Sequence, residues 1–181
     1  MRIFNFTLIA SGLDPTDPSF EERLFEAGCG DATVSFQRGV LIFEFDREAR
    51  TFAKALISGL IDVQSAGAKV THIEPDHLVN LSEIAERSNL SRAAVSLYAS
   101  GQRGHDFPSP IARLTTESPL WDWVDVSKWM FHKGTISRSA VVEAQIVRDA
   151  NAIIRGAEAP PAHPFFTHVM QARLSHRHES Q

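Results

Sequence analysis

The stretch LSEIAERSNLSRAAVSLY, residues 81–98, constrains the fold of this chain most, because its capping, turn and apolar positions agree with one another. Ser82 is placed to cap a first short helix. Asn89 falls where that helix must end, and asparagine tolerates the left-handed conformation better than most residues. Ser91 is placed to cap a second helix. The stretch therefore predicts two helices joined by a tight turn, a helix-turn-helix.

The two faces of this predicted motif differ in composition. The inner face holds small and apolar residues, namely Ile84, Ala85, Leu90, Ala94, Val95 and Tyr98. The outer face of the second helix holds Ser91, Arg92, Ala93, Ser96, Leu97 and Ser100. Small and polar side chains let a helix enter the major groove, which is ~12 Å wide, where arginine reads guanine or holds a phosphate and serines suit phosphates and bases. The alternative is a helical hairpin that only packs.

The next segment, residues 99–130, continues the pattern with Phe107-Pro108-Ser109-Pro110, a short apolar stretch from Ile111 to Leu114, Trp121, and then VDVSKWM. Residues 81–131 thereby resemble the AlpA, excisionase and MerR-like winged-helix families. In those families a recognition helix is followed by a Phe-Pro-x-Pro stretch, a β-wing, a tryptophan and a last helix. The resemblance implies a DNA-binding module, and together with the N-terminal part it implies a bacterial regulator.

The loop and wing of this module supply further candidate DNA contacts. Gln102, Arg103, His105 and Arg113 are expected to face the sugar-phosphate backbone, and Gly101 and Gly104 to let the main chain approach it. Lys128 and Lys133 are candidates for phosphate contacts or for a purely solvated role. Asp125 or Ser127 is expected to start the last helix. The remaining apolar residues predict a core, namely Trp121, Trp123, Val126, Trp129 and Met130.

The first part of the chain alternates between strand and helix patterns. Strands are predicted at residues 3–10, 32–37, 40–46 and 69–75, from apolar side chains at every second position. Helices are predicted at 19–28, with Ser19 as cap and Gly28 at its end, and at 52–66, with Asp46 as cap and Gly67 as stop. Arg38-Gly39 is expected to make a tight hairpin turn.

The resulting order βαββαβ predicts a ferredoxin-like unit with two helices on one face of an antiparallel sheet. This fold names no function, so dimerisation and small-ligand sensing both stay open. The acidic residues Asp14, Asp17, Glu21 and Glu22 are interpreted as turn and helix-start residues, and the alternative is a metal site.

The charge of the chain is uneven. Residues 1–79 hold 7 Lys/Arg against 12 Asp/Glu, residues 80–134 hold 6 against 6, and residues 135–181 hold 5 against 4. A surface that attracts polyanions is therefore expected after the first part, as a local patch. The single cysteine, Cys29, excludes an internal disulfide framework and is interpreted as a small buried residue.

The last part predicts one helix at 137–156, capped by Ser137 or Ser139, with a stripe of Val142, Ile146, Ala150, Ile153 and Ile154. A proline-rich linker follows, and then a segment in which Phe165, Phe166, Val169, Met170 and Leu174 predict a short docking helix. This segment is a candidate protein-binding region. Its histidines, His163, His168, His176 and His178, lack a second ligand type at a fixed spacing and predict no metal site.

Together these patterns predict an α+β chain with three parts: a ferredoxin-like βαββαβ domain at 1–78, a winged helix-turn-helix at 79–133, and a C-terminal helix and tail at 134–181. We expect a sequence-specific regulator that binds double-stranded DNA as a homodimer. The alternatives are an excisionase-like DNA-bending factor and an antitoxin-type or adaptor module. No enzyme motif, cofactor, metal site, export signal or membrane helix is expected, which favours the cytoplasm.

Overall fold

The computed structural model describes residues 1–156, which contain both helices and strands. These residues group into two compact units. Unit 1 is Met1–Pro75 together with the described residues from Asp149 on, and unit 2 is Asp76–Arg148. Helix α6 (Arg138–Ile154) contributes residues to both units. Within the described part of the chain, no helix is long and apolar enough to cross a membrane. The predicted docking helix and the four histidines after residue 160 lie outside the described residues.

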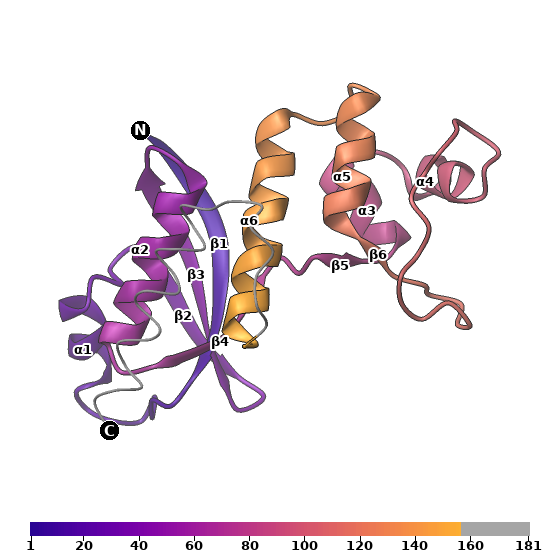
Figure 1. Cartoon of the computed structure of the whole chain (residues 1–181). Helices are drawn as coiled ribbons and strands as arrows, with labels where there is room; N and C mark the ends of the chain where they lie inside the picture. Colours follow the sequence, from indigo (N-terminus) through magenta and orange to yellow (C-terminus); the bar gives the residue numbers. More distant parts are fainter. Residues whose placement is uncertain (157–181) are drawn as a thin grey trace. The chain divides into compact units, whose positions relative to one another are not determined.

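Unit 1 contains a four-stranded antiparallel sheet in the order β2-β3-β1-β4 (Figure 1). Its strands are β1 (Arg2–Ser11), β2 (Ala32–Gln37), β3 (Val40–Ala49) and β4 (Lys69–Glu74). Arg38 and Gly39 make the turn between β2 and β3, both with positive φ (52° and 83°). Positive φ at both central residues is the signature of a type I′ turn, whose twist matches that of the flanking strands. The predicted hairpin is confirmed.

Alternating side chains of β1 and β3 form the core of unit 1. Phe4, Phe6 and Leu8 are buried on β1, and Leu41, Phe43 and Phe45 are buried on β3. Helix α2 (Phe52–Ser65) covers this face, where its Gly59 lies so close to Phe6 that an added Cβ would be 2.9 Å from the ring. Burial of these apolar side chains is the main driving force for this unit.

Of the two predicted helix caps in unit 1, Asp46 is wrong, and Ser19 is right in position but makes no side-chain hydrogen bond to the helix. Asp46 lies inside β3, opposite Asn5, and accepts a hydrogen bond from the Asn5 side chain. The cap of α2 is instead Thr51, whose hydroxyl accepts from the Lys54 amide at 3.3 Å. At α1 (Phe20–Glu26), Ser19 stands at the N-cap position but makes no side-chain cap, because its hydroxyl donates to Asp17.

The acidic residues before α1 are turn residues, as one of the two interpretations predicts. Asp14 accepts from the Thr16 hydroxyl at 2.7 Å and from the Thr16 amide at 2.8 Å, and Asp17 accepts from the Ser19 amide at 2.9 Å. These hydrogen bonds favour the ionised carboxylates and lower the pKa of both residues. Among residues 1–156, no group of three or more His, Cys, Asp and Glu is arranged to hold a metal ion.

Arg47 is a buried cation at the end of β3, on the same face as Phe45. Its guanidinium donates two hydrogen bonds to Asp31, at 2.8 and 2.6 Å, and one to Asp62 at 2.5 Å. It also donates to the Gly28 carbonyl at 2.9 Å. Arg47 thereby connects the loop before β2 with α2. A buried charge needs such partners because burial penalises the charged form.

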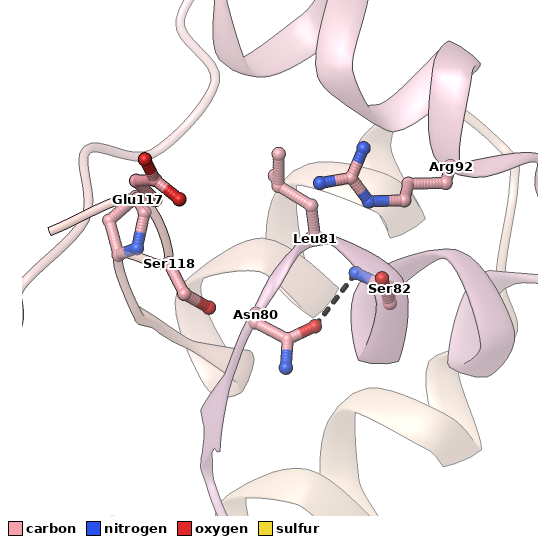
Figure 2. A pocket seen from close by; sticks show the side chains of 7 residues that line it. Asn80, Leu81, Ser82, Arg92, Glu117 and Ser118 are labelled. Atoms are coloured by element: carbon pink, nitrogen blue, oxygen red, sulfur yellow. Dashed lines mark hydrogen bonds between the residues drawn. The ribbon is translucent and has the colours of Figure 1, made fainter.

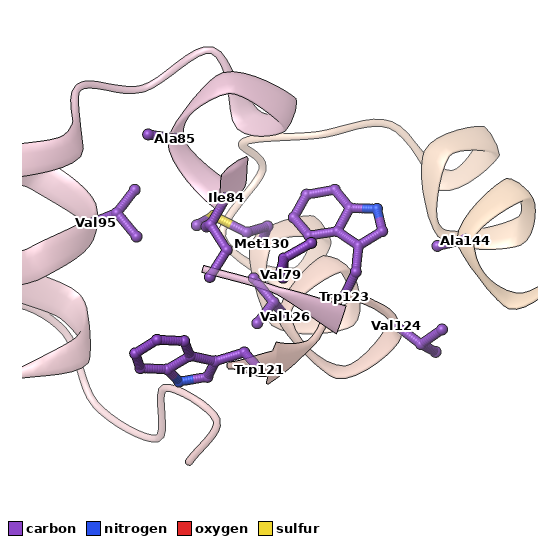
Figure 3. Packing of buried hydrophobic residues seen from close by; sticks show 10 residues of the cluster. All are labelled: Val79, Ile84, Ala85, Val95, Trp121, Trp123, Val124, Val126, Met130 and Ala144. Atoms are coloured by element: carbon purple, nitrogen blue, oxygen red, sulfur yellow. The ribbon is translucent and has the colours of Figure 1, made fainter. Parts of the chain in front are cut away.

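Unit 2 begins with a short sheet of β5 (Leu78–Val79) and β6 (Trp121–Asp122) and contains three further helices: α3 (Leu81–Ser88), α4 (Arg92–Ala99) and α5 (Trp123–His132). Its core holds Val79, Ile84, Ala85, Val95, Trp121, Trp123, Val124, Val126, Met130 and Ala144. Figure 3 shows Val95 pointing from α4 toward Ile84 and Met130. Four of the five predicted core residues of this region are buried, and Trp129 is partly buried against them.

The predicted start of the last helix of this region is wrong. Asp122 caps α5 by accepting from the Val124 amide at 2.7 Å, so Asp125 lies in the first turn of the helix. Ser127 is fully buried and donates to the Val124 carbonyl at 2.8 Å. At α6, the Ser137 hydroxyl accepts from the Ala140 amide at 3.3 Å, as one of the two predicted caps would.

Candidate nucleic-acid interface

Helices α3 and α4 are joined by a short turn, and three local residues define their ends: Asn80, Asn89 and Ser91. Asn80 caps α3 by accepting from the amides of Ser82 (2.8 Å) and Glu83 (3.1 Å), and the Glu83 carboxylate accepts from the Asn80 amide at 2.7 Å. This reciprocal pair is a capping box. The prediction that Ser82 is the cap is therefore wrong by two positions.

The turn itself agrees with the sequence. Asn89 ends α3 in the left-handed conformation, with φ 53° and ψ 39°. Ser91 then caps α4, its hydroxyl accepting from the Ala94 amide at 3.2 Å. Because the turn is this short, α4 follows α3 directly, and the buried contacts of Ile84, Ala85 and Val95 hold the two helices together.

The outer face of α4 is open to solvent. Ser91, Arg92, Ala93, Leu97 and Ser100 are exposed, and Ser96 is half-buried. Leu97 is 39% exposed. The predicted face is thus left free by the rest of the described fold, as entry into a groove would require.

The loop after α4 is held in place by two tryptophans. The Trp129 indole donates to the His105 carbonyl at 2.9 Å, and the Trp121 indole donates to the Pro108 carbonyl at 3.0 Å. Between these two anchors, the Phe107 ring lies 5.1 Å from Trp129 and 6.5 Å from Trp121. These contacts hold the loop backbone at His105 and Pro108.

The predicted contact residues of this loop point outward. Gln102, Arg103 and His105 are exposed, and the Arg103 guanidinium lies 5.2 Å over the Tyr98 ring. Gly104 has φ 73°, and a Cβ there would be 3.4 Å from both Tyr98 and Trp129. The close approach at Gly104 is therefore to these aromatic rings.

The predicted wing strand from Ile111 to Leu114 is mostly absent. A single bridge joins Ala112 to Leu120, and the Leu120 amide donates to the Ala112 carbonyl at 2.9 Å. Arg113 is exposed with φ 52°, and its carbonyl accepts from the Thr116 amide at 3.0 Å. The segment is short and Pro119 has no amide to donate, so the chain forms a turn here and few strand-to-strand hydrogen bonds.

A small cavity of about 120 Å³ brings Arg92 together with residues that the sequence did not single out as a site. Its lining comes from the start of α3, the start of α4 and the segment before β6: Asn80, Leu81, Ser82, Arg92, Glu117, Ser118 and Pro119. Figure 2 shows Arg92 and Glu117 on opposite sides of it. The Asn80-x-x-Glu83 spacing is a readable cap signal, whereas no local pattern marks Glu117 or Ser118.

Among the exposed residues of unit 2, cations outnumber anions, although the unit as a whole holds equal numbers of the two. Its exposed cations are Arg92, Arg103, Arg113, Lys128, Lys133 and Arg138, and its exposed anions are Glu86, Asp106, Glu117 and Asp125. Arg87 does not belong to this surface. Its guanidinium donates to the Asp76 carbonyl at 2.7 Å and lies 5.5 Å over the Trp123 ring, and burial lowers its pKa. Lys133 lies 5.2 Å over the Trp129 ring.

The comparisons with known proteins add no relative. No family model matches the sequence, no curated protein is significantly similar, and no solved structure matches the fold significantly.

Proposed function

We propose that this protein is a sequence-specific DNA-binding regulator, with α4 as the helix that enters the major groove. The observation that carries the proposal is the free outer face of α4, on which Arg92, Ala93 and Leu97 are exposed although the opposite face, at Val95, is fully buried. Exposed small residues let the helix backbone approach base edges, and Arg92 supplies the guanine or phosphate contact.

Each predicted contact has a distinct role in this proposal. Arg103 and Arg113 bind phosphates on either side of the groove, while Gln102 and His105 contact the backbone from the anchored loop. At the small cavity, a phosphate would meet the Arg92 guanidinium and the Ser82 and Ser118 hydroxyls. The Glu117 carboxylate repels an anion there and weakens this contact.

We propose also that unit 1 is ferredoxin-like and that unit 2 is a reduced winged helix. The strand order β2-β3-β1-β4, with α1 joining β1 to β2 and α2 joining β3 to β4, supports the first. The β5–β6 pair and the Ala112–Leu120 bridge support the second. The regulator acts as a dimer, because a single module with few cations binds DNA weakly and two modules multiply the contacts.

The experiment that tests this function is selection of duplexes bound by the full chain from a random DNA library. The expected result is an enriched motif with two half-sites about one helical turn, or ~34–36 Å, apart. Enrichment of no motif at low and physiological salt would overturn sequence-specific recognition.

DNA bending is a second candidate function, because Leu114 is 66% exposed beside Arg113 in the turn after the Ala112 bridge. An apolar side chain next to an arginine suits insertion between base steps in the minor groove. Fluorescence transfer between the ends of a bound duplex distinguishes the two functions. A bend that is lost in Leu114→Ser favours the bending factor, and a straight bound duplex excludes it.

A further inference from the structure

The two edges of the unit 1 sheet differ in whether their outward backbone groups have hydrogen-bond partners. At the β4 edge, the Asn151 side chain donates to the Ile73 carbonyl and accepts from the Ile73 amide, both at 2.8 Å. Asn151 is fully buried, and it satisfies the edge-facing backbone groups of Ile73 as a neighbouring strand would. At the other edge, no strand of the described residues pairs with the outer side of β2.

The sequence of β2 lacks the devices that usually protect an open edge. Residues 32–37 read ATVSFQ, without a charge or a proline, and the β2–β3 register runs without a bulge. Phe36 is 53% exposed, although its partner Leu41 on the same face is buried. An uncharged edge with an exposed aromatic residue is a template for pairing with another strand.

The register shows which backbone groups of β2 are available. The Asp46 amide donates to the Asp31 carbonyl at 3.1 Å, which makes 31 and 46 a hydrogen-bonded pair in the same register as the hairpin. Hydrogen-bonded and non-hydrogen-bonded pairs alternate in an antiparallel ladder. The backbone groups of Thr33, Ser35 and Gln37 therefore point toward β3, and those of Ala32, Val34 and Phe36 point toward the free edge.

We propose that β2 pairs in antiparallel fashion with β2 of a second copy of this chain, across a two-fold axis at Ser35. Residues that lie opposite each other in a sheet share one face, and along each strand the faces alternate. In a two-fold pair of identical strands, odd-numbered residues therefore lie opposite odd-numbered residues, and even-numbered opposite even-numbered. With Ser35 opposite its own counterpart, Val34 lies opposite Phe36 and Thr33 lies opposite Gln37. The edge groups of positions 34 and 36 then form hydrogen-bonded pairs.

The chemistry of the strand favours a second copy over another partner. This register places an aromatic residue against a β-branched one twice, on the face that holds Phe43 and Leu41, so the two cores become continuous. The other face brings together only serine, threonine and glutamine. Because β2 has no charge, no like-charge pair opposes the two-fold arrangement, which is self-complementary.

This inference extends the proposed function, because the β2–β2 pair would be the interface of the dimeric regulator. Its test uses the full chain without DNA, so failure of self-association and failure of DNA binding are separate results. Sedimentation equilibrium should give a dimer for the wild type. Ser35→Lys places two ammonium groups opposite each other and should raise the dissociation constant at least about tenfold.

Thr71→Lys is the control for Ser35→Lys, because Thr71 is an exposed position on β4, at the opposite edge of the sheet. This variant also removes one hydrogen bond, from the Thr71 hydroxyl to the Ile9 carbonyl at 3.2 Å. It should leave the dissociation constant unchanged, and circular dichroism should show both variants folded. A wild type that stays monomeric at every concentration, or an equal effect of the two variants, overturns the proposal.

A cysteine scan tests the register itself. In the proposed pair, the two Ser35 Cα atoms face each other at about 4.5 Å, within disulfide range. Ser35→Cys should therefore form a cross-linked dimer on mild oxidation. Thr33→Cys should not, because the two Thr33 positions are offset by four residues, about 13 Å along the strand. The wild type should not cross-link either, because Cys29 is buried. Cross-linking of Thr33→Cys as fast as Ser35→Cys overturns the proposed register.

Discussion

At the scale of single residues, Cys29 illustrates how burial controls a reactive group. The thiol is 4% exposed, and burial together with the nearby Asp62 carboxylate raises its pKa to about 11. The thiolate is the reactive form, so the folded protein at pH 8 holds little of it. We expect a disulfide reagent to react with the native protein at least about a hundredfold more slowly than with the urea-unfolded chain. Equal rates would contradict the buried position.

Arg47 makes a second residue-scale prediction, because its bond to Asp31 depends on ionisation. The hydrogen bonds from Arg47 lower the pKa of Asp31 below 3.8, so the folded state binds a proton less readily than the unfolded state. The stabilisation is thus present above pH 4 and is lost as pH falls through the folded-state pKa.

The variant Asp31→Asn tests this linkage. Asp31 is one-third exposed, so after allowance for solvent screening we expect a loss of about 1 kcal/mol in unfolding free energy at pH 7. The loss should shrink below pH 4, as measured by urea unfolding at several pH values. Glu48→Gln, at an exposed position of β3, is the control and should be neutral. A loss that is independent of pH would show that the ion pair is not its cause.

At the scale of elements, the N-caps of α2, α3 and α5 could not be predicted from the sequence, whereas Ser91 caps α4 as predicted. Ser82 and Asp46 are good capping types, but a cap is decided by where the helix starts, and that depends on packing. Val79 is fully buried in β5, which leaves Asn80 as the first residue free to cap α3. Asp46 stays in β3 because Arg47, next to it, is bound by Asp31 and Asp62, which are distant in sequence.

The α3 cap gives an element-scale prediction with an internal control. Asn80→Ala removes a side chain that accepts two amide hydrogen bonds and should lower the unfolding free energy by about 1 kcal/mol. Ser82→Ala should cost much less, because the Ser82 side chain does not cap α3. Thermal unfolding of the two variants measures the difference. A larger loss of unfolding free energy for Ser82→Ala than for Asn80→Ala would show that Ser82 is the cap of α3, as the sequence predicts.

The loop after α4 gives another prediction for an element. Trp129→Phe keeps an aromatic ring near Tyr98 and Phe107 but removes the indole donor to the His105 carbonyl. We expect faster amide hydrogen exchange in residues 100–110 and weaker DNA binding, with α3 and α4 still protected. Unchanged exchange in the loop would show that the indole bond does not hold it.

At the scale of the whole molecule, features that depend on neighbouring residues could be predicted from the sequence, and features that depend on long-range contacts could not. The alternating strands, the Arg38-Gly39 turn and the left-handed Asn89 were predictable, because each depends on neighbouring residues. The burial of Arg47, the bonds from Asn151 to Ile73 and the cavity beside Arg92 were not, because each joins residues distant in sequence. The predicted domain boundaries and DNA contacts stay predictions.

The central claim is that the exposed face of α4 binds duplex DNA, and the most direct test is the salt dependence of affinity for Arg92→Ala. The control is Arg50→Ala, which removes an exposed cation from unit 1. Loss of Arg92 should cost about 1–3 kcal/mol of binding, and the salt slope should fall by about 1 if its contact is a phosphate. Arg50→Ala should bind like the wild type. If the affinities of both variants at every salt concentration equal that of the wild type, α4 is not the DNA-binding helix.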